Sequence, residues 1–204
     1  MALTTTSYAI LGLLTLRAWS AYDLAKQMAR SLHHIWPRAE RAVYDEPRKL
    51  VAEGLARAST EQTGRRTRTV YTITAKGRVE FRRWLGEASA RPAFESEAMV
   101  RTMFAEQATK DQVTATIAGL RRFAQDFQSQ LVDQAQSYLD ADGSAFPDRL
   151  HAIGLAGRFV HEYAAAIERW ARWAEGEVAG WDDPANSAEH GERILREIIR
   201  DFRN

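Results

Sequence analysis

The feature that most constrains the fold is one short hairpin pattern inside a chain whose apolar spacing is otherwise helical. Residues 63–74 read TGRRTRTVYTIT, in which Thr63-Gly64 provides a tight turn and the later residues alternate in the manner of a strand. We therefore expect a strand over residues 55–62, a turn at 63–65 and a returning strand over 66–73. Few architectures place a single hairpin among helices, so the order of the helices around it is decisive.

Helical patterns lie on both sides of this hairpin. An apolar stretch at residues 4–19 predicts a buried first helix, and Ser20 is placed to cap a second one. A third helix is expected over residues 38–53 with Gly54 as its C-terminal stop, and Thr74 caps a fourth. The order helix, helix, helix, hairpin, helix is that of a winged helix-turn-helix, whose second and third helices form the DNA-reading unit.

The remainder of the chain is predicted to be helical throughout. Ser96 begins a short helix, and Thr109 with Gln112 forms a capping box at the start of a much longer one. Residues 140–148 are rich in turn formers, and a second long helix and a short final helix follow them. Long helices with sustained apolar spacing usually pack against a long partner helix, so this half is expected to dimerise.

Charge is divided unevenly between the two halves. Residues 1–90 hold 15 Lys and Arg against 8 Asp and Glu, whereas residues 91–204 hold 13 against 19. The net charges of +7 and −6 favour a polyanionic partner for the first half alone. We expect a mainly α protein, with a winged-helix DNA-binding domain that has one two-stranded wing at residues 1–90. An all-helical dimerisation and effector domain is expected at residues 91–204.

The composition argues against several other classes of protein. The chain has no cysteine, which rules out disulfides and thiolate metal sites and fits a reducing cytoplasm. No apolar run reaches the roughly 18 residues that a bilayer requires, so no membrane partner is expected. The adjacent His33 and His34 lack metal-ligand spacing, and no nucleophile elbow or phosphate-binding loop occurs. We therefore expect no metal, no cofactor and no enzymatic activity.

Three motifs, in order along the first half, resemble the PadR family of bacterial transcriptional regulators. The first helix contains Ile10-Leu11-Gly12-Leu13-Leu14, and the second contains Ala21-Tyr22-Asp23-Leu24. The wing ends in Tyr71-Thr72-Ile73-Thr74-Ala75-Lys76-Gly77. The resemblance implies a winged helix that binds double-stranded DNA and, as in the larger members, a helical C-terminal domain of comparable length.

The predicted recognition helix departs from the family pattern at one position. It contains Val43-Tyr44-Asp45-Glu46-Pro47-Arg48-Lys49-Leu50, with proline where the pattern has leucine. Proline lacks a backbone donor and clashes with a preceding carbonyl when it lies deep in a helix. Two outcomes remain open: the helix begins late, with Pro47 in its first turn or two, or it kinks at Pro47.

Basic and aromatic residues of the recognition helix and the wing are the predicted DNA contacts. Arginine pairs with guanine through two hydrogen bonds, while tyrosine and lysine more often contact phosphate. The resemblance implies that Tyr44 faces the DNA backbone, and the alternative is that Tyr44 packs inside the domain. The predicted contacts are Arg38, Arg41, Tyr44, Arg48 and Lys49 in the helix and Arg65, Arg66 and Arg68 in the wing.

Aromatic side chains in the second half indicate a ligand site. In several PadR-like regulators, flat hydrophobic ligands bind between the C-terminal helices and the DNA-binding domain, and the resemblance implies such a site here. The alternative is ordinary core or dimer packing. The predicted effector-binding residues are Phe94, Met103, Phe127, Trp170 and Trp173.

These patterns together predict a homodimeric, cytoplasmic transcriptional repressor that binds a pseudo-palindromic operator and is released by a small aromatic or hydrophobic inducer. A dimer is expected because two recognition helices must reach half-sites about one DNA turn apart. Two other classes stay open: an adaptor whose winged helix binds protein, and a helical enzyme that uses His161 and Glu162. The sequence specifies neither the operator, the regulated gene, the ligand, nor the choice between repression and activation.

Overall fold

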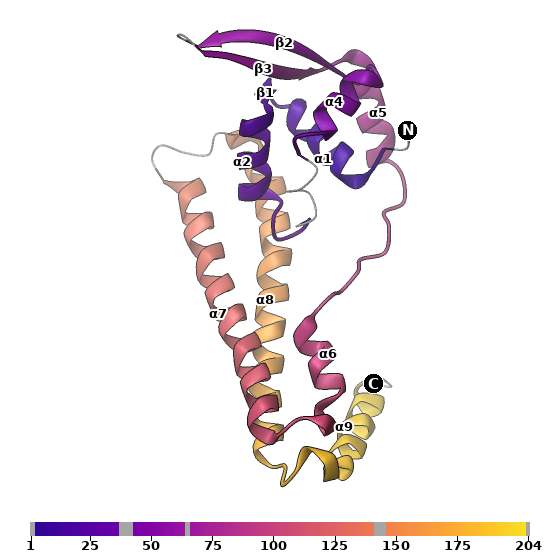
Figure 1. Ribbon diagram of the computed structural model, residues 1–204, viewed down its shortest axis with the longest axis vertical. Coiled ribbons are helices and arrows are strands. Elements are labelled where there is room, and N and C mark those ends of the chain that lie inside the picture. The colour runs from indigo at the N-terminus through magenta and orange to yellow at the C-terminus, as the bar shows by residue number, and fades with distance from the viewer. Residues whose placement is uncertain (1–2, 37–42, 64–65, 141–145, 203–204) are drawn as a thin grey trace. The chain divides into compact units, whose positions relative to one another are not determined.

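The computed structural model of the chain describes residues 3–36, 43–63, 66–140 and 146–202. The chain divides into two compact units, Met1–Pro92 and Ala93–Asn204, and each is described by itself (Figure 1). Within the described ranges, every helix is too short or too polar to cross a lipid bilayer.

The N-terminal unit is a winged helix. Its described elements are α1 (Thr5–Leu14), β1 (Trp19–Ser20), α2 (Ala21–Ser31), α4 (Glu46–Ala52), β2 (Ala56–Thr63), β3 (Arg66–Ile73) and α5 (Ala75–Leu85). The three strands form one antiparallel sheet in the order β1-β3-β2. Strands β2 and β3 are the two arms of the predicted hairpin, which confirms the wing and the mainly α fold class.

The predicted end of the first helix is wrong. The helix was expected to extend to residue 19, but α1 ends at Leu14 and Trp19 begins strand β1, which pairs with Tyr71 of β3. Trp19 is buried, and its indole N–H donates a hydrogen bond to the carbonyl of Leu13 over 2.8 Å. A strand of two residues contains no alternation to detect, so the third strand of the sheet could not be predicted from the pattern.

The third helix also starts later than predicted. Helix α4 begins at Glu46, and Val43–Asp45 form a turn instead of helix. Pro47 occupies the second helical position, where a missing N–H costs nothing because the first-turn donors have no intrahelical acceptor. Of the two outcomes that Pro47 left open, the chain adopts the late start.

Local end signals set the other boundaries as predicted. Gly54, with φ of 70°, ends α4 in the left-handed conformation, and the N–H of Leu55 returns to the carbonyl of Leu50 over 2.8 Å. Ser20 and Thr74 each accept a hydrogen bond from a backbone N–H of the helix that follows. These caps fix where α2 and α5 begin relative to the sheet.

The core of this unit is built by α1, α2 and α4 with the sheet. Its fully buried large side chains include Ile10, Leu11, Leu14, Leu24, Met28 and Leu50. One close approach requires glycine, because a Cβ on Gly77 would lie 2.1 Å from the carbonyl oxygen of Leu55. The glycine that ends the wing motif therefore lets α5 pack directly against the start of the hairpin.

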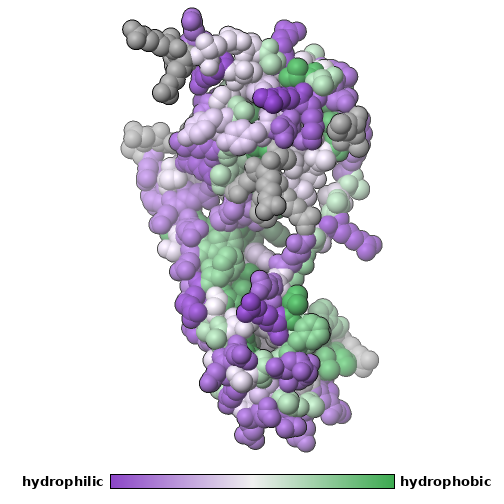
Figure 2. All heavy atoms as spheres, viewed as in Figure 1, coloured by the Kyte–Doolittle hydropathy of each residue, from purple (hydrophilic) through white to green (hydrophobic). Residues whose placement is uncertain are grey.

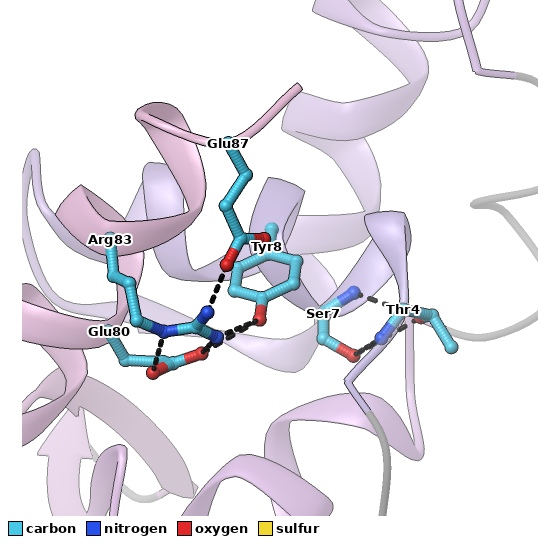
Figure 3. A network of polar contacts seen from close by, with 6 residues as sticks. All are labelled: Thr4, Ser7, Tyr8, Glu80, Arg83 and Glu87. Atoms are coloured by element: carbon cyan, nitrogen blue, oxygen red, sulfur yellow. Dashed lines mark hydrogen bonds and ion pairs between the residues drawn. The ribbon is translucent and has the colours of Figure 1, made fainter. Parts of the chain in front are cut away.

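A polar cluster fastens α1 to α5 (Figure 3). Tyr8 donates a hydrogen bond to Glu80 over 2.8 Å, and its ring stacks on Trp84 with centroids 4.6 Å apart. Arg83 binds Glu80 at 2.6 Å and also pairs with Glu87. Hydrogen bonds from Arg83 and then from Tyr8 lower the pKa of Glu80 to about 2, while burial raises the pKa of the Tyr8 hydroxyl. We call Tyr8, Glu80, Arg83 and Glu87 the α1–α5 clasp.

The C-terminal unit is helical, and two 30-residue helices dominate it. Helices α7 (Lys110–Leu139) and α8 (Leu150–Ala179) lie antiparallel along each other (Figure 1). The shorter elements are α6 (Glu97–Met103), α9 (Ala188–Asp201) and the 3-10 turns η1 (Ala105–Gln107), η2 (Pro147–Arg149) and η3 (Pro184–Asn186). The predicted long helix is confirmed, as are the cap at Ser96 and the capping box of Thr109 with Gln112.

Two apolar clusters and a charged layer join α7 to α8. The first cluster comprises Ala105, Val113, Ile117, Ala171, Ala174 and Val178, and the second comprises Phe127, Val160 and Ala164. Between them along α7, Arg121 donates a hydrogen bond to Glu175 over 2.6 Å and lies 3.6 Å from the buried Glu168. A hydrogen bond from Arg172 lowers the pKa of Glu168. Sliding one helix along the other would separate these charges, so the layer favours a single register.

Candidate nucleic-acid interface

Helix α4 and the turn before it present a polar, mostly cationic face to solvent. The side chains of Arg48 and Lys49 are exposed, while Pro47 and Leu50 of the helix are buried. Tyr44, in the preceding turn, is 55% exposed, which excludes the alternative that it packs inside the domain. The predicted contacts Arg38 and Arg41 lie outside the described residues. The described part of this face therefore offers a phenol hydroxyl, a guanidinium and an ammonium group, together with the exposed carboxylate of Asp45.

A buried carboxylate supports this face from inside the domain. Glu46 is 5% exposed and accepts a hydrogen bond from the hydroxyl of Ser7, a fully buried residue of α1. Its other oxygen lies 3.0 Å from the ammonium of Lys49, whose side chain is half exposed. The carboxylate thus ties the start of α4 to α1 and holds Lys49 at the surface. Glu46 was not among the predicted functional residues, although acids are favoured in the first turn of a helix.

The wing is buried at its base and exposed further out. Val70 and Tyr71 belong to the core, whereas residues 67–69 are exposed. The predicted contact Arg65 lies outside the described residues, and so does the side chain of Arg66. The outer part of the hairpin is therefore accessible to a partner, while its base is fixed by the sheet.

Arg68 is held by two carboxylates from different elements. Its Nη1 lies 3.4 Å from Oδ2 of Asp23 in α2, and its Nη2 lies 3.2 Å from Oε2 of Glu61 in β2. The three side chains remain between 36% and 49% exposed. Arg68 was a predicted DNA contact, but neither acid was among the predicted functional residues. The cross-strand register, which pairs Glu61 with Arg68, was the available signal.

The five predicted effector residues occupy different environments in the C-terminal unit. Phe127 is buried in the second apolar cluster of the α7–α8 pair, and Trp170 packs partly buried against the first. Phe94, Met103 and Trp173 are 63%, 77% and 41% exposed. For Phe127 and Trp170 the alternative of core packing describes what is observed, while the other three lie at the surface.

The neighbouring histidines after α2 contact each other. The rings of His33 and His34 meet edge to face with centroids 5.0 Å apart, and burial, followed by the charge of His33, lowers the pKa of His34. Among the side chains that the structure describes, no group of three His, Asp or Glu is arranged to hold a metal ion.

Comparison with protein families places a match in the N-terminal unit. Residues 10–83 match the family described as "Transcriptional regulator PadR-like family". This range contains the helices α2 and α4 and all three strands, together with the motifs that begin at Ile10 and end at Gly77. The matched residues are therefore those that build the exposed face and the wing.

Two curated proteins are similar to part of the chain. The "Probable transcriptional regulator Rv1176c" of Mycobacterium tuberculosis is 36% identical over 81 residues, and the "Negative transcriptional regulator PadR" of Bacillus subtilis is 34% identical over 79 residues. The matches cover 39% and 38% of this chain and 43% of each relative. The chain thus spans less than half the length of the curated relatives it matches.

Solved structures share the fold over most of the chain. The crystal structure of Bacillus subtilis PadR in complex with operator DNA has a TM-score of 0.74 at 21% identity, covering 86% of this chain and 99% of that one. The same protein in complex with p-coumaric acid has a TM-score of 0.68 at 20% identity, covering 88% and 100%. The Vibrio cholerae virulence activator AphA has a TM-score of 0.65 at 20% identity, covering 86% and 98%.

Proposed function

The chain belongs to the PadR-like family of transcriptional regulators, and from this premise we propose that it is a DNA-binding repressor. The family consists of regulators and not of enzymes. Repression is favoured over activation because a negative regulator is 34% identical to part of this chain. We place its action in the cytoplasm, on double-stranded operator DNA.

The exposed face of α4 is the observation that carries the proposal. Tyr44 lies in the turn before the helix that a winged helix inserts into the major groove, and Arg48 and Lys49 lie within that helix. In the proposed complex, Arg48 pairs with a base edge, and Tyr44 and Lys49 bind phosphate. Arg38, Arg41, Arg65 and Arg66 remain proposed contacts from the sequence, and a related protein of the same fold is described in complex with operator DNA.

Self-association supplies the second recognition helix. On the face shown in Figure 2, hydrophobic residues gather over the helices of the C-terminal unit. Leu155 and Phe159, one turn apart on α8, are 76% and 69% exposed, and Ile198 and Ile199 on α9 are about half exposed. Apolar surface of this kind marks an interface. We propose a homodimer whose two copies bind the half-sites of a pseudo-palindromic operator.

Release from DNA is proposed to follow the binding of a small aromatic ligand. Phe94, Met103 and Trp173 offer accessible apolar side chains, and the related Bacillus subtilis PadR is described in complex with p-coumaric acid. Such a ligand would favour a dimer whose two wings do not match the operator spacing, so that its binding lowers the occupied fraction of operator. Phe127 and Trp170 would act in this proposal through the packing of α7 on α8.

Selection of bound fragments from the source genome tests the proposal. The expected result is a small set of pseudo-palindromic fragments that bind at least about 1000-fold more tightly than random duplex, which is the usual margin of specific over nonspecific binding. A reporter driven by a selected fragment should lose expression when the protein is produced. Equal binding to selected and random duplexes would contradict sequence-specific regulation. Increased expression of the reporter would instead indicate an activator.

Two variants and a matched control sharpen this test. Lys49→Ala should weaken binding to every duplex and reduce the slope of log affinity against log salt by about one. Arg48→Ala should instead lose discrimination at one base pair, at about 1–3 kcal/mol. Arg101→Ala removes the same charge from an exposed residue of α6 and should leave both quantities unchanged.

A further inference from the structure

We propose that Arg68 is a positioning residue that fixes the wing against α2, and that its guanidinium does not contact DNA in the bound state. The proposal rests on the proposed DNA-binding function, since it assigns a role within that interface. It separates Arg68 from the neighbouring wing arginines, with which the sequence pattern alone would group it.

The geometry places one guanidinium at the junction of three elements. Arg68 belongs to β3, and its two terminal nitrogens reach Asp23 of α2 at 3.4 Å and Glu61 of β2 at 3.2 Å. Each carboxylate takes a different nitrogen, so both contacts exist at the same time. An arginine can make this bridge because its donors form a planar fork, which the single ammonium of a lysine lacks.

The carboxylate of Asp23 is positioned independently of Arg68, and the strand register places Glu61 opposite Arg68. The hydroxyl of Ser20, which caps α2, accepts from the N–H of Asp23 at 3.1 Å and donates to Oδ2 of Asp23 at 2.8 Å. Glu61 lies directly across the antiparallel ladder from Arg68. The carboxylate of Asp23 is therefore in place before the guanidinium binds, which reduces the entropy lost in forming the bridge.

The position of Arg68 along the wing explains what the bridge adds. Strand β1 supports β3 only as far as Ser20, which pairs with the buried Val70. Arg68 follows two residues further out on the same face of β3, because side chains alternate along a strand. Its bridge therefore attaches β3 to α2 beyond the last backbone pairing between β1 and β3, at the point where the side chains of β3 become exposed.

Electrostatics favours this role over direct contact. A phosphate that recruited Arg68 would leave Asp23 and Glu61 without their shared cation on a surface proposed to approach a polyanion. With the bridge intact, one positive charge offsets the repulsion of two negative ones. The bridge gives the acid of the motif Ala21-Tyr22-Asp23-Leu24 a physical role, because Asp23 anchors the wing to α2.

The two roles predict opposite signs for one substitution. If Arg68 positions the wing, Glu61→Gln weakens DNA binding by about two- to five-fold, the range expected for an exposed ion pair. Arg68→Gln weakens DNA binding by a similar factor, and Arg68→Lys has the same effect as Arg68→Gln. The double variant Glu61→Gln/Arg68→Gln loses no more affinity than the weaker-binding single variant. The salt dependence of binding stays that of the wild type, because no phosphate contact is removed.

The experiment measures the affinity of the full-length protein for a 30-base-pair duplex of mixed sequence, a probe length of about three DNA turns, across a salt series. Amide hydrogen exchange of residues 67–69 is measured in the free protein, where it should accelerate in Arg68→Gln and Glu61→Gln. Glu97→Gln, a charge-matched change on α6, is the control for both. Two results would overturn the proposal. The first is tighter DNA binding by Glu61→Gln, together with a slope of log affinity against log salt that is lowered by about one in Arg68→Gln. The second is unchanged amide hydrogen exchange in every variant. A wild-type protein that does not bind duplex DNA overturns the proposed function itself, and the exchange data distinguish that failure from loss of the bridge.

Discussion

The two units of the molecule differ in how completely they bury their own apolar residues. In the N-terminal unit, Ile10, Leu11 and Leu24 are fully enclosed. In the C-terminal unit, Leu155 of α8 is 76% exposed and Phe202 at the end of α9 is 89% exposed. The first unit exposes a few large apolar side chains, such as Val79 and Leu85, whereas the second exposes many more, as surfaces that form interfaces do. We therefore expect added atoms in the core to destabilise the first unit, and changes to the exposed apolar surface to weaken self-association of the second.

The largest effect is expected when a single methyl group is added to one glycine in each unit. Gly77→Ala would place a Cβ 2.1 Å from the carbonyl oxygen of Leu55, and both atoms belong to backbone that α5 and β2 hold in place. We expect the free energy of unfolding of the N-terminal unit to fall by about 3 kcal/mol or more, as in overpacked cores. Urea denaturation followed by tryptophan fluorescence measures the change.

The matched change in the other unit should have the opposite sign. An added Cβ on Gly176 of α8 meets nothing within 4 Å. Gly176→Ala should therefore stabilise the helix, by about 0.5–1 kcal/mol, because alanine loses less backbone entropy than glycine. Destabilisation by Gly176→Ala comparable to that of Gly77→Ala would contradict the contrast between the units.

Self-association is the property of the C-terminal unit that should respond most to a change in its exposed apolar surface. Replacing both Leu155 and Phe159 by Asp should raise the dissociation constant of the proposed dimer by about 100-fold or more, because charge would replace apolar side chains at the proposed interface. Sedimentation velocity over a concentration series measures it. The helical signal of the protomer should persist, since neither side chain is part of its core. His161→Asp, at another exposed position of α8, should leave association unchanged, and a wild-type protein that stays monomeric at every concentration would exclude the homodimer.

The same contrast explains how much of the molecule the sequence could predict. In the N-terminal unit the predictive signals are local: Ser20 and Thr74 cap helices, and Gly54 ends one, as expected. These residues act on their immediate backbone, so their meaning does not depend on distant contacts. The long helices of the second unit were predictable for a similar reason, because a sustained apolar period needs no knowledge of the partner.

Strand β1 and the burial of Glu46 escaped prediction because they depend on contacts between distant residues, whereas the late start of α4 was one of the outcomes already open at Pro47. Trp19 forms a strand because Tyr71 pairs with it, and no local pattern contains that partner. Glu46 reads as a surface acid until its contact with Ser7, 39 positions away, removes it from solvent. The contact of Arg68 with Asp23, 45 positions away, was likewise not visible in the sequence. Charged side chains are therefore the residues whose roles are hardest to assign from sequence, since their partners decide them.

The smallest expected effect concerns the α1–α5 clasp, in which Arg83 and Glu87 are about half exposed. The pKa of Glu80 is lowered to about 2 from its ordinary 4.5, so the carboxylate is bound more tightly to its partners in the folded state. Its contribution is complete above about pH 4.5 and is lost as the pH falls toward 2. Solvent screening limits this contribution to about 1 kcal/mol.

Glu80→Gln should accordingly lower stability at pH 6, and the difference from the wild type should shrink as the solution is acidified. The measurement is the urea midpoint of both proteins at a series of pH values between the two limits. Glu97→Gln, on an exposed helix of the other unit, should follow the wild type throughout. A difference for Glu80→Gln that stayed constant with pH would mean that the side chain acts through its shape and hydrogen bonds, and that the charge of the clasp contributes nothing to holding α1 on α5.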